Sequence, residues 1–262
     1  MTAPNPFDEV IERIRVAGYH NQRLEDHSDL VSKGIFRDLL ARCPSIASDF
    51  ELGTIRAWEN VKSPGGTRRR LIDLFVGQPS GADQPSLDGV RFVVENKSVM
   101  TAHRNKTNRL DDLDKVLSAI HGARPEAVLV ATVLVGTASR YLNVCDRITP
   151  YFEDKPGEFE STVLPRLSSG DETLWKDFRY AISRNQPDHP KKTVEAFRQL
   201  PTRAPGRTHV MGFDFVMIVP VFVDNVNPPR LCRDNPFGID IDGDYAQMLS
   251  TICRAYQARW HL

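Results

Sequence analysis

The stretch RFVVENKSVMTAHRNKTNRLDDL, residues 91–113, begins like a buried β-strand and ends like a helix. Its apolar run closes on Glu95 and Lys97, and several basic side chains follow. Side chains alternate across a strand, so Glu95 and Lys97 point to one face while Asn96 points to the other. The stretch therefore predicts a strand that carries an acid and an amine side by side where it ends.

The preceding apolar run, RRLIDLFVG, carries Asp73 between Ile72 and Leu74. An acid inside a strand is costly unless it is paired or binds a cation. If the two strands are adjacent, Asp73 and Glu95 converge and supply the oxygen ligands that Mg²⁺ prefers. A bound Mg²⁺ with Lys97 beside it suits phosphodiester hydrolysis, because the metal polarises the phosphate and the amine orients or deprotonates water. The alternative is a buried salt bridge between Lys97 and the two acids.

The rest of the chain predicts a single α/β domain whose core alternates helices and strands. A helix capped by Ser28 precedes three strand-like runs, a second helix starts at a cap at Asn108, and the apolar strand PEAVLVATVLVG follows. Pro220 inside the later run HVMGFDFVMIVPVFVDN indicates an edge position or a break. The expected boundaries are a core at about 28–136 and 209–224, a largely helical insertion at about 139–201, in which SSGDETLWKDFRYAISRN is the clearest helix, and a C-terminal helix at about 244–260.

Asp73 followed by the tripeptide Glu95-Asn96-Lys97 on the next strand resembles the D…(D/E)xK signature of the PD-(D/E)xK nuclease superfamily. The proline that usually precedes the first acid is replaced here by Ile72. The resemblance implies a restriction-endonuclease-like αβββαβ core with a mixed central sheet, and an activity most like that of a type II restriction endonuclease. It also implies that Asp73 and Glu95 bind Mg²⁺ and that Lys97 activates the nucleophile.

Members of this superfamily often add an acid from the first core helix. The stretch KGIFRDLL resembles the KGxxxE pattern of archaeal resolvases, which would make Asp38 a third metal ligand. Glu25 and Asp29, near the start of the same helix, are competing candidates. An exposed helical Asp38 paired with a nearby arginine is the structural alternative.

Basic side chains flank the predicted site on both sides. Those after Lys97 lie before the next helix, whose N-terminus also favours a phosphate, so the expected DNA backbone contacts are Arg104, Lys106, Arg109 and His103. Arg69 and Arg70, which enter the Asp73 strand, would contact the other side of the duplex or lie in solvent. Bases would be read by the insertion or by the loop at 77–89, and the resemblance implies a homodimer, since palindromic DNA is cut by two-fold dimers.

Composition limits the other classes of function. Lys plus Arg and Asp plus Glu both count 34, so a site for double-stranded DNA must come from local charge. No apolar stretch is long enough to span a membrane, and a cytoplasmic location with reduced, packed cysteines is expected. Asp240, Asp242 and Asp244 indicate a turn and helix cap rather than a calcium loop. The rival functions are a resolvase or repair nuclease, a ligand-activated anti-phage effector, and a catalytically silent DNA-binding module.

Overall fold

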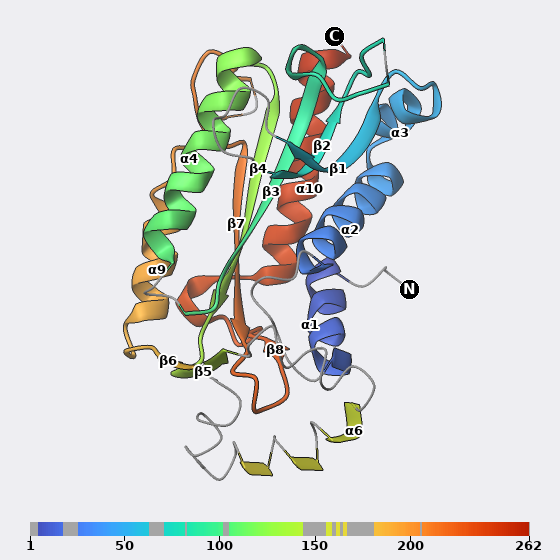
Figure 1. Ribbon diagram of the computed structural model, residues 1–262. Coiled ribbons are helices and arrows are strands. Elements are labelled where there is room, and N and C mark those ends of the chain that lie inside the picture. The colour runs from blue at the N-terminus through green and yellow to red at the C-terminus, as the bar shows by residue number, and fades with distance from the viewer. Residues whose placement is uncertain are drawn as a thin grey trace.

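The computed structural model describes residues 5–17, 26–62, 71–81, 83–101, 105–143, 156–158, 161–162, 165–166, 181–204 and 206–261. A six-stranded sheet in the order β1-β2-β3-β4-β7-β8 lies at its centre (Figure 1). Its strands are β1 Arg56–Lys62, β2 Leu71–Gly77, β3 Val90–Val99, β4 Val128–Gly136, β7 Phe215–Phe222 and β8 Arg230–Leu231. A separate pair joins β5 Arg140–Asn143 to β6 Ala181–Arg184.

The sheet is mixed. β1, β2 and β3 are antiparallel neighbours, β3, β4 and β7 are parallel, and β8 returns antiparallel to β7. Every residue of β4 is buried. This agrees with its uninterrupted apolar sequence, because parallel strands are covered on both faces.

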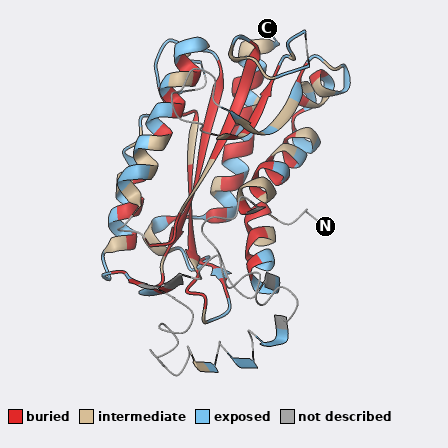
Figure 2. Ribbon diagram, viewed as in Figure 1, coloured by how far each residue is buried: buried red, intermediate tan, exposed pale blue. Residues whose placement is uncertain are grey.

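Helices cover both faces of this sheet (Figure 1). α4 and α9 pack on one face, α2 and α10 pack on the other, and α1 packs against α2. Their bounds are α1 Pro6–Ala17, α2 Asp26–Arg42, α3 Pro44–Glu51, α4 Lys106–Ala123, α9 His189–Arg198 and α10 Ile241–Trp260, with a short α6 Pro156–Glu158. The buried residues concentrate in the strands between the two helical layers (Figure 2). No helix in these ranges is long and apolar enough to cross a membrane.

The mixed α/β class and the order helix, three strands, helix, strand are confirmed, with α3 added between α2 and β1. Two predicted helix caps are wrong. Ser28 is the third residue of α2, and Asn108 lies inside α4, which begins at Lys106 after Asn105. The helix cap expected among Asp240, Asp242 and Asp244 is found at Asp240, whose side chain accepts a hydrogen bond from the Gly243 backbone N–H.

The insertion agrees with the helical prediction in α9 but differs from it at β5 and β6. The residues Ala181–Arg184, which were expected to end a helix, form β6 and pair with β5. Local helical spacing was outweighed there by pairing with a strand distant in sequence. Pro220 neither breaks β7 nor lies at the sheet edge. It is tolerated because β8 is very short: its two residues pair with Val221 and Phe222, and on that side Pro220 only has to accept, from the Cys232 backbone N–H at 3.0 Å.

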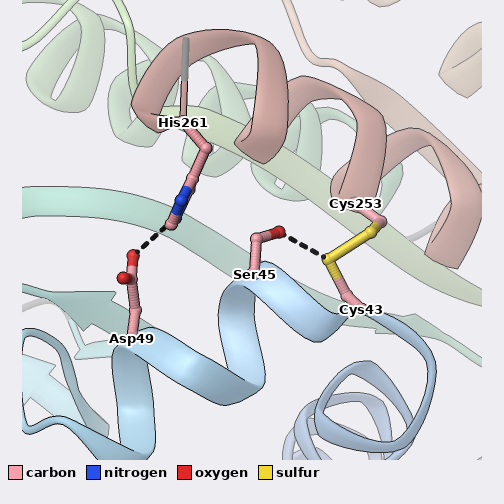
Figure 3. The surroundings of a disulfide bond; sticks show 5 residues. All are labelled: Cys43, Ser45, Asp49, Cys253 and His261. Carbon is pink, nitrogen blue, oxygen red and sulfur yellow. Dashed lines mark hydrogen bonds and ion pairs between the residues drawn. A yellow bond between two sulfur atoms is a disulfide. The ribbon is translucent and has the colours of Figure 1, made fainter.

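The expectation of reduced cysteines is wrong for one pair. Cys43, between α2 and α3, forms a disulfide with Cys253 of α10 (Figure 3). The two residues are separated by 210 positions, and only the packing of α10 on this corner brings them together. Close by, His261 and Tyr256 both contact the Asp49 carboxylate, which further fixes α10. Disulfides are typical of oxidising compartments, so this pair does not support a cytoplasmic location.

Candidate active site between strands β2 and β3

The site lies where β2 and β3 stop pairing. Their ladder ends at Leu74 opposite Val94, and beyond it β3 continues alongside β4 only. Asp73 and Glu95 are the next residues along the two strands. The Asp73 side chain replaces one of the backbone hydrogen bonds that end there, because its Oδ2 accepts the Asn96 backbone N–H at 2.6 Å. The opening of the sheet therefore brings the first acid against the tripeptide, as the sequence predicts.

Lys97 links the two acids. Its ammonium group donates a hydrogen bond to Glu95 Oε1 and lies 3.9 Å from Asp73 Oδ2. It also donates to the Asn96 carbonyl oxygen at 3.3 Å. The contact with Glu95 confirms that Glu95 and Lys97 share one face of β3. The Lys97 ammonium group thus reaches both carboxylates. The site is largely buried, since the side chains of Lys97 and Asp73 are only 11% and 13% exposed.

Glu95 is the most buried member of the group, with a side chain 3% exposed. The pKa of its carboxyl is raised to about 7, chiefly by burial, with the charge of Asp73 adding to the rise and Lys97 opposing it. Its second oxygen, Oε2, is buried without a hydrogen-bond partner. A buried carboxylate oxygen that lacks a donor is costly, so this atom is the natural position for a cation or a proton.

Asp38 does not join this group. Its carboxylate accepts hydrogen bonds from Tyr245 Oη at 2.8 Å and from Arg37 Nε at 3.0 Å, so it fixes α2 to α10. The α2 residue that contacts Asp73 is Ser28. Ser28 lies about 15 Å from Asp38 along the helix axis, at a rise of 1.5 Å per residue. The prediction of Asp38 as a third ligand is therefore corrected. The structural alternative is right about the arginine, which is Arg37, but wrong about exposure, because Asp38 is buried. Asp29 accepts from Asn60 at 2.9 Å, and Glu25 lies outside the described residues.

The predicted DNA contacts are only partly described. Lys106 and Arg109 lie in the first turn of α4, on the helix that follows the active strand. Arg109 donates to Asp112 at 3.3 Å, which holds its guanidinium along the helix. The remaining candidates, Arg104, His103, Arg69 and Arg70, lie outside the described residues.

The residues present fit a divalent cation with few protein ligands. Within the described ranges, no cluster of three or more His, Cys, Asp or Glu side chains could hold a metal. Asp73 and Glu95 nevertheless supply two carboxylates, of which Glu95 Oε2 has no donor. Mg²⁺ is commonly held by one or two carboxylates, with water and substrate phosphate as its other ligands. A pair of acids is thus compatible with Mg²⁺, but not with an ion that needs a full protein cage.

The pKa of Glu95 predicts how the stability of the metal-free protein depends on pH. Because the folded pKa of about 7 exceeds the ordinary glutamate value of 4.5, the folded state binds the extra proton between these values. Stability from this group should therefore fall as pH rises through that window, by about 1–3 kcal/mol. His121 acts oppositely, since burial lowers its pKa from 6.5 to about 4 and stability rises with pH in that range.

The measurement is urea unfolding in EDTA from pH 4.5 to 8, for the wild type and Glu95→Gln. The difference between the two proteins cancels the contribution of His121. The difference in the free energy of unfolding should favour Glu95→Gln increasingly as pH rises toward 8. A difference that does not change with pH would show that Glu95 is ionised throughout this range.

Sequence reasoning did not assign functional roles to three polar residues beside the acids. Ser28 Oγ donates to Asp73 Oδ1 at 2.5 Å, and the Asn96 side chain contacts Ser28. Thr132 of β4 donates to Asn96 Oδ1 at 2.7 Å. A signal was present for Thr132, because it is the single polar residue in the buried run AVLVATVLV. No local signal indicated that Ser28 faces the acid.

The chain was compared with protein-family models, with curated proteins and with solved structures. No family model matches it, and neither of the other two comparisons gives a significant match.

Proposed function

We propose that this protein is a Mg²⁺-dependent nuclease that hydrolyses DNA phosphodiester bonds, with Asp73 and Glu95 as metal ligands and Lys97 as the group that acts on the attacking water. The single observation that carries the proposal is Glu95 Oε2, a buried carboxylate oxygen without a donor, beside Asp73 and Lys97. The D…ExK resemblance supports it independently.

The charge balance favours this function over a structural salt bridge. Above the Glu95 pKa of about 7, two ionised carboxylates against one ammonium leave a net negative charge in a largely buried site. A purely structural cluster would gain from removing that charge, because buried ion pairs seldom repay the cost of desolvation. The imbalance becomes useful if a divalent cation binds there.

Each residue has a separate task in hydrolysis. Bound Mg²⁺ would polarise the phosphate and lower the pKa of a coordinated water. Asp73 and Glu95 would hold the cation between β2 and β3. Lys97, which reaches both acids, would orient or help deprotonate the attacking water, or offset the charge that develops on the phosphate.

The substrate we propose is double-stranded DNA cut at a specific sequence by a homodimer, as in type II restriction endonucleases. The near-neutral chain supports this, because it offers no bulk positive charge for indiscriminate binding. Lys106 and Arg109 at the start of α4 would contact the backbone near the cleaved phosphate.

The test is incubation of the purified full chain with plasmid DNA and Mg²⁺, with Ca²⁺ in parallel. Asp73→Asn should abolish cleavage, whereas Asp114→Asn, an exposed acid on α4, is the matched control and should cut like the wild type. Discrete fragments would support restriction, and a smear would indicate a nonspecific nuclease. Cleavage of branched DNA alone would indicate a resolvase. A wild type inactive on plasmid, branched and single-stranded DNA would contradict the proposal.

A further inference from the structure

The Asp73 carboxylate is held by one hydrogen-bond donor on each oxygen. Ser28 Oγ donates to Oδ1 at 2.5 Å, and the Asn96 backbone N–H donates to Oδ2 at 2.6 Å. The first distance is in the range of charge-assisted O–H···O⁻ bonds. Since a carboxylate oxygen has two acceptor positions, each oxygen keeps one for a cation. The two donors therefore fix the direction of Asp73 without consuming its capacity to bind metal.

The direction of the Ser28 hydrogen is set by its neighbours. Thr132 Oγ1 donates to Asn96 Oδ1 at 2.7 Å, which assigns the oxygen of the amide to the β4 side. The Asn96 Nδ2, which can only donate, then faces Ser28 Oγ at 3.3 Å and Ser32 Oγ at 2.9 Å. Because Asn96 Nδ2 has only two hydrogens for Ser32 Oγ, the Ser28 carbonyl and Ser28 Oγ, its contact with Ser28 Oγ is a shared one, and the single Ser28 hydrogen is directed to Asp73 Oδ1. These hydrogen bonds form a relay, Thr132–Asn96–Ser28–Asp73, which runs from β4 through β3 and α2 to the acid on β2.

This relay ends in the core at Thr132, while Ser28 and Asn96 are half-buried. Ser32 and Thr132 are 0% and 1% exposed. Asn96 Nδ2 also donates to the Ser28 backbone carbonyl at 3.1 Å, which fixes the first turn of α2 to β3. Because three separate elements hold Ser28 and Asn96, the Asp73 carboxylate is oriented before any cation arrives. Such preorganisation is how residues behind the ligands tune metal affinity.

We infer that Ser28, oriented by Asn96, is the positioning residue that aims the Asp73 carboxylate at the cation, so that the first helix contributes a hydroxyl in place of the expected third acid. This inference rests on the proposed function, because it requires a cation between Asp73 and Glu95. Ser28 does not touch the reacting atoms. It acts through Asp73, and Asn96 and Thr132 act through Ser28.

The experiment measures Mn²⁺ binding to the purified full chain by calorimetry, without DNA. Ser28→Ala should weaken Mn²⁺ affinity by about 10–100-fold, the range for residues that orient metal ligands. Ser28→Thr should restore most of it, because the hydroxyl is kept. Thr132→Val, at the far end of the relay, should weaken binding in the same direction but less. Ser118→Ala, an exposed serine on α4, is the control and should bind like the wild type.

The dependence of DNA cleavage on Mg²⁺ concentration is a second measurement, and a purely structural role for Ser28 would not change it. The Mg²⁺ concentration for half-maximal cleavage should rise in Ser28→Ala, while the rate at saturating Mg²⁺ changes much less. If folded Ser28→Ala binds Mn²⁺ as the wild type does while Asp73→Asn does not bind, the inference fails and the proposed function stands. If the wild type does not bind Mn²⁺, both fail. If Ser28→Ala does not fold, Thr132→Val decides, and unchanged affinity overturns the inference.

Discussion

Replacing Lys97 with methionine should lower the rate of DNA cleavage by about 10²–10⁴-fold, the usual contribution of a positioned proton-transfer group. Methionine keeps an apolar side chain of similar length and removes only the charged group. The loss should appear in kcat, because Lys97 would act on the attacking water rather than bind the DNA backbone. Plasmid cleavage over a range of DNA concentrations at saturating Mg²⁺ measures it.

The same substitution separates catalysis from a structural salt bridge. In the variant, Glu95 loses its contact with the ammonium while its other oxygen already lacks a donor. A structural bridge predicts lower stability and unchanged DNA behaviour. Catalysis predicts loss of cleavage in a protein that still binds Mn²⁺. Lys115→Met on the exposed side of α4 is the matched control, and equal cleavage by both variants would exclude a catalytic role for Lys97.

Replacing Asp214 with alanine should lower the free energy of unfolding by about 3–5 kcal/mol, the usual cost of breaking a buried ion pair. Asp214 precedes β7, and its carboxylate accepts hydrogen bonds from Arg203 Nη2 at 3.0 Å and from Arg259 Nη2. The side chains of Asp214 and Arg203 are 0% exposed, and that of Arg259 is 2% exposed. Removing the carboxylate would take from two buried guanidinium groups the negative charge that they share.

Asp214 also joins distant parts of the fold. Its Oδ2 accepts the Leu129 backbone N–H at 3.0 Å, so it links the start of β4 to the end of α10 through Arg259. Urea unfolding at neutral pH measures the loss, with Asp234→Ala at an exposed position as the control. Asp214→Asn should lose less, because it keeps an acceptor for Leu129. A loss below about 1 kcal/mol for Asp214→Ala would show that the cluster contributes little.

Much of the core could be predicted because its signals are local. The apolar runs of β2, β3 and β4 each bury a continuous stretch, and their order with the intervening helix agrees with the prediction. The proximity of Asp73 and Glu95 also followed from two consecutive strands that carry acids near one end. The insertion and the helix caps were less predictable. β6 depends on β5, a partner about 40 residues earlier, and the start of α4 depends on how the chain leaves β3.

The sequence by itself determined which residues carry charge into the strands, namely Asp73, Glu95 and Lys97, and that the last two share a face. This follows because alternation along a strand is a local property of the backbone. Only the tertiary structure decided that β2 and β3 part beside these acids, that Ser28 rather than Asp38 contacts Asp73, and that Cys43 meets Cys253. These are contacts between segments far apart in the chain, and they depend on how helices pack on the sheet, which no local pattern encodes.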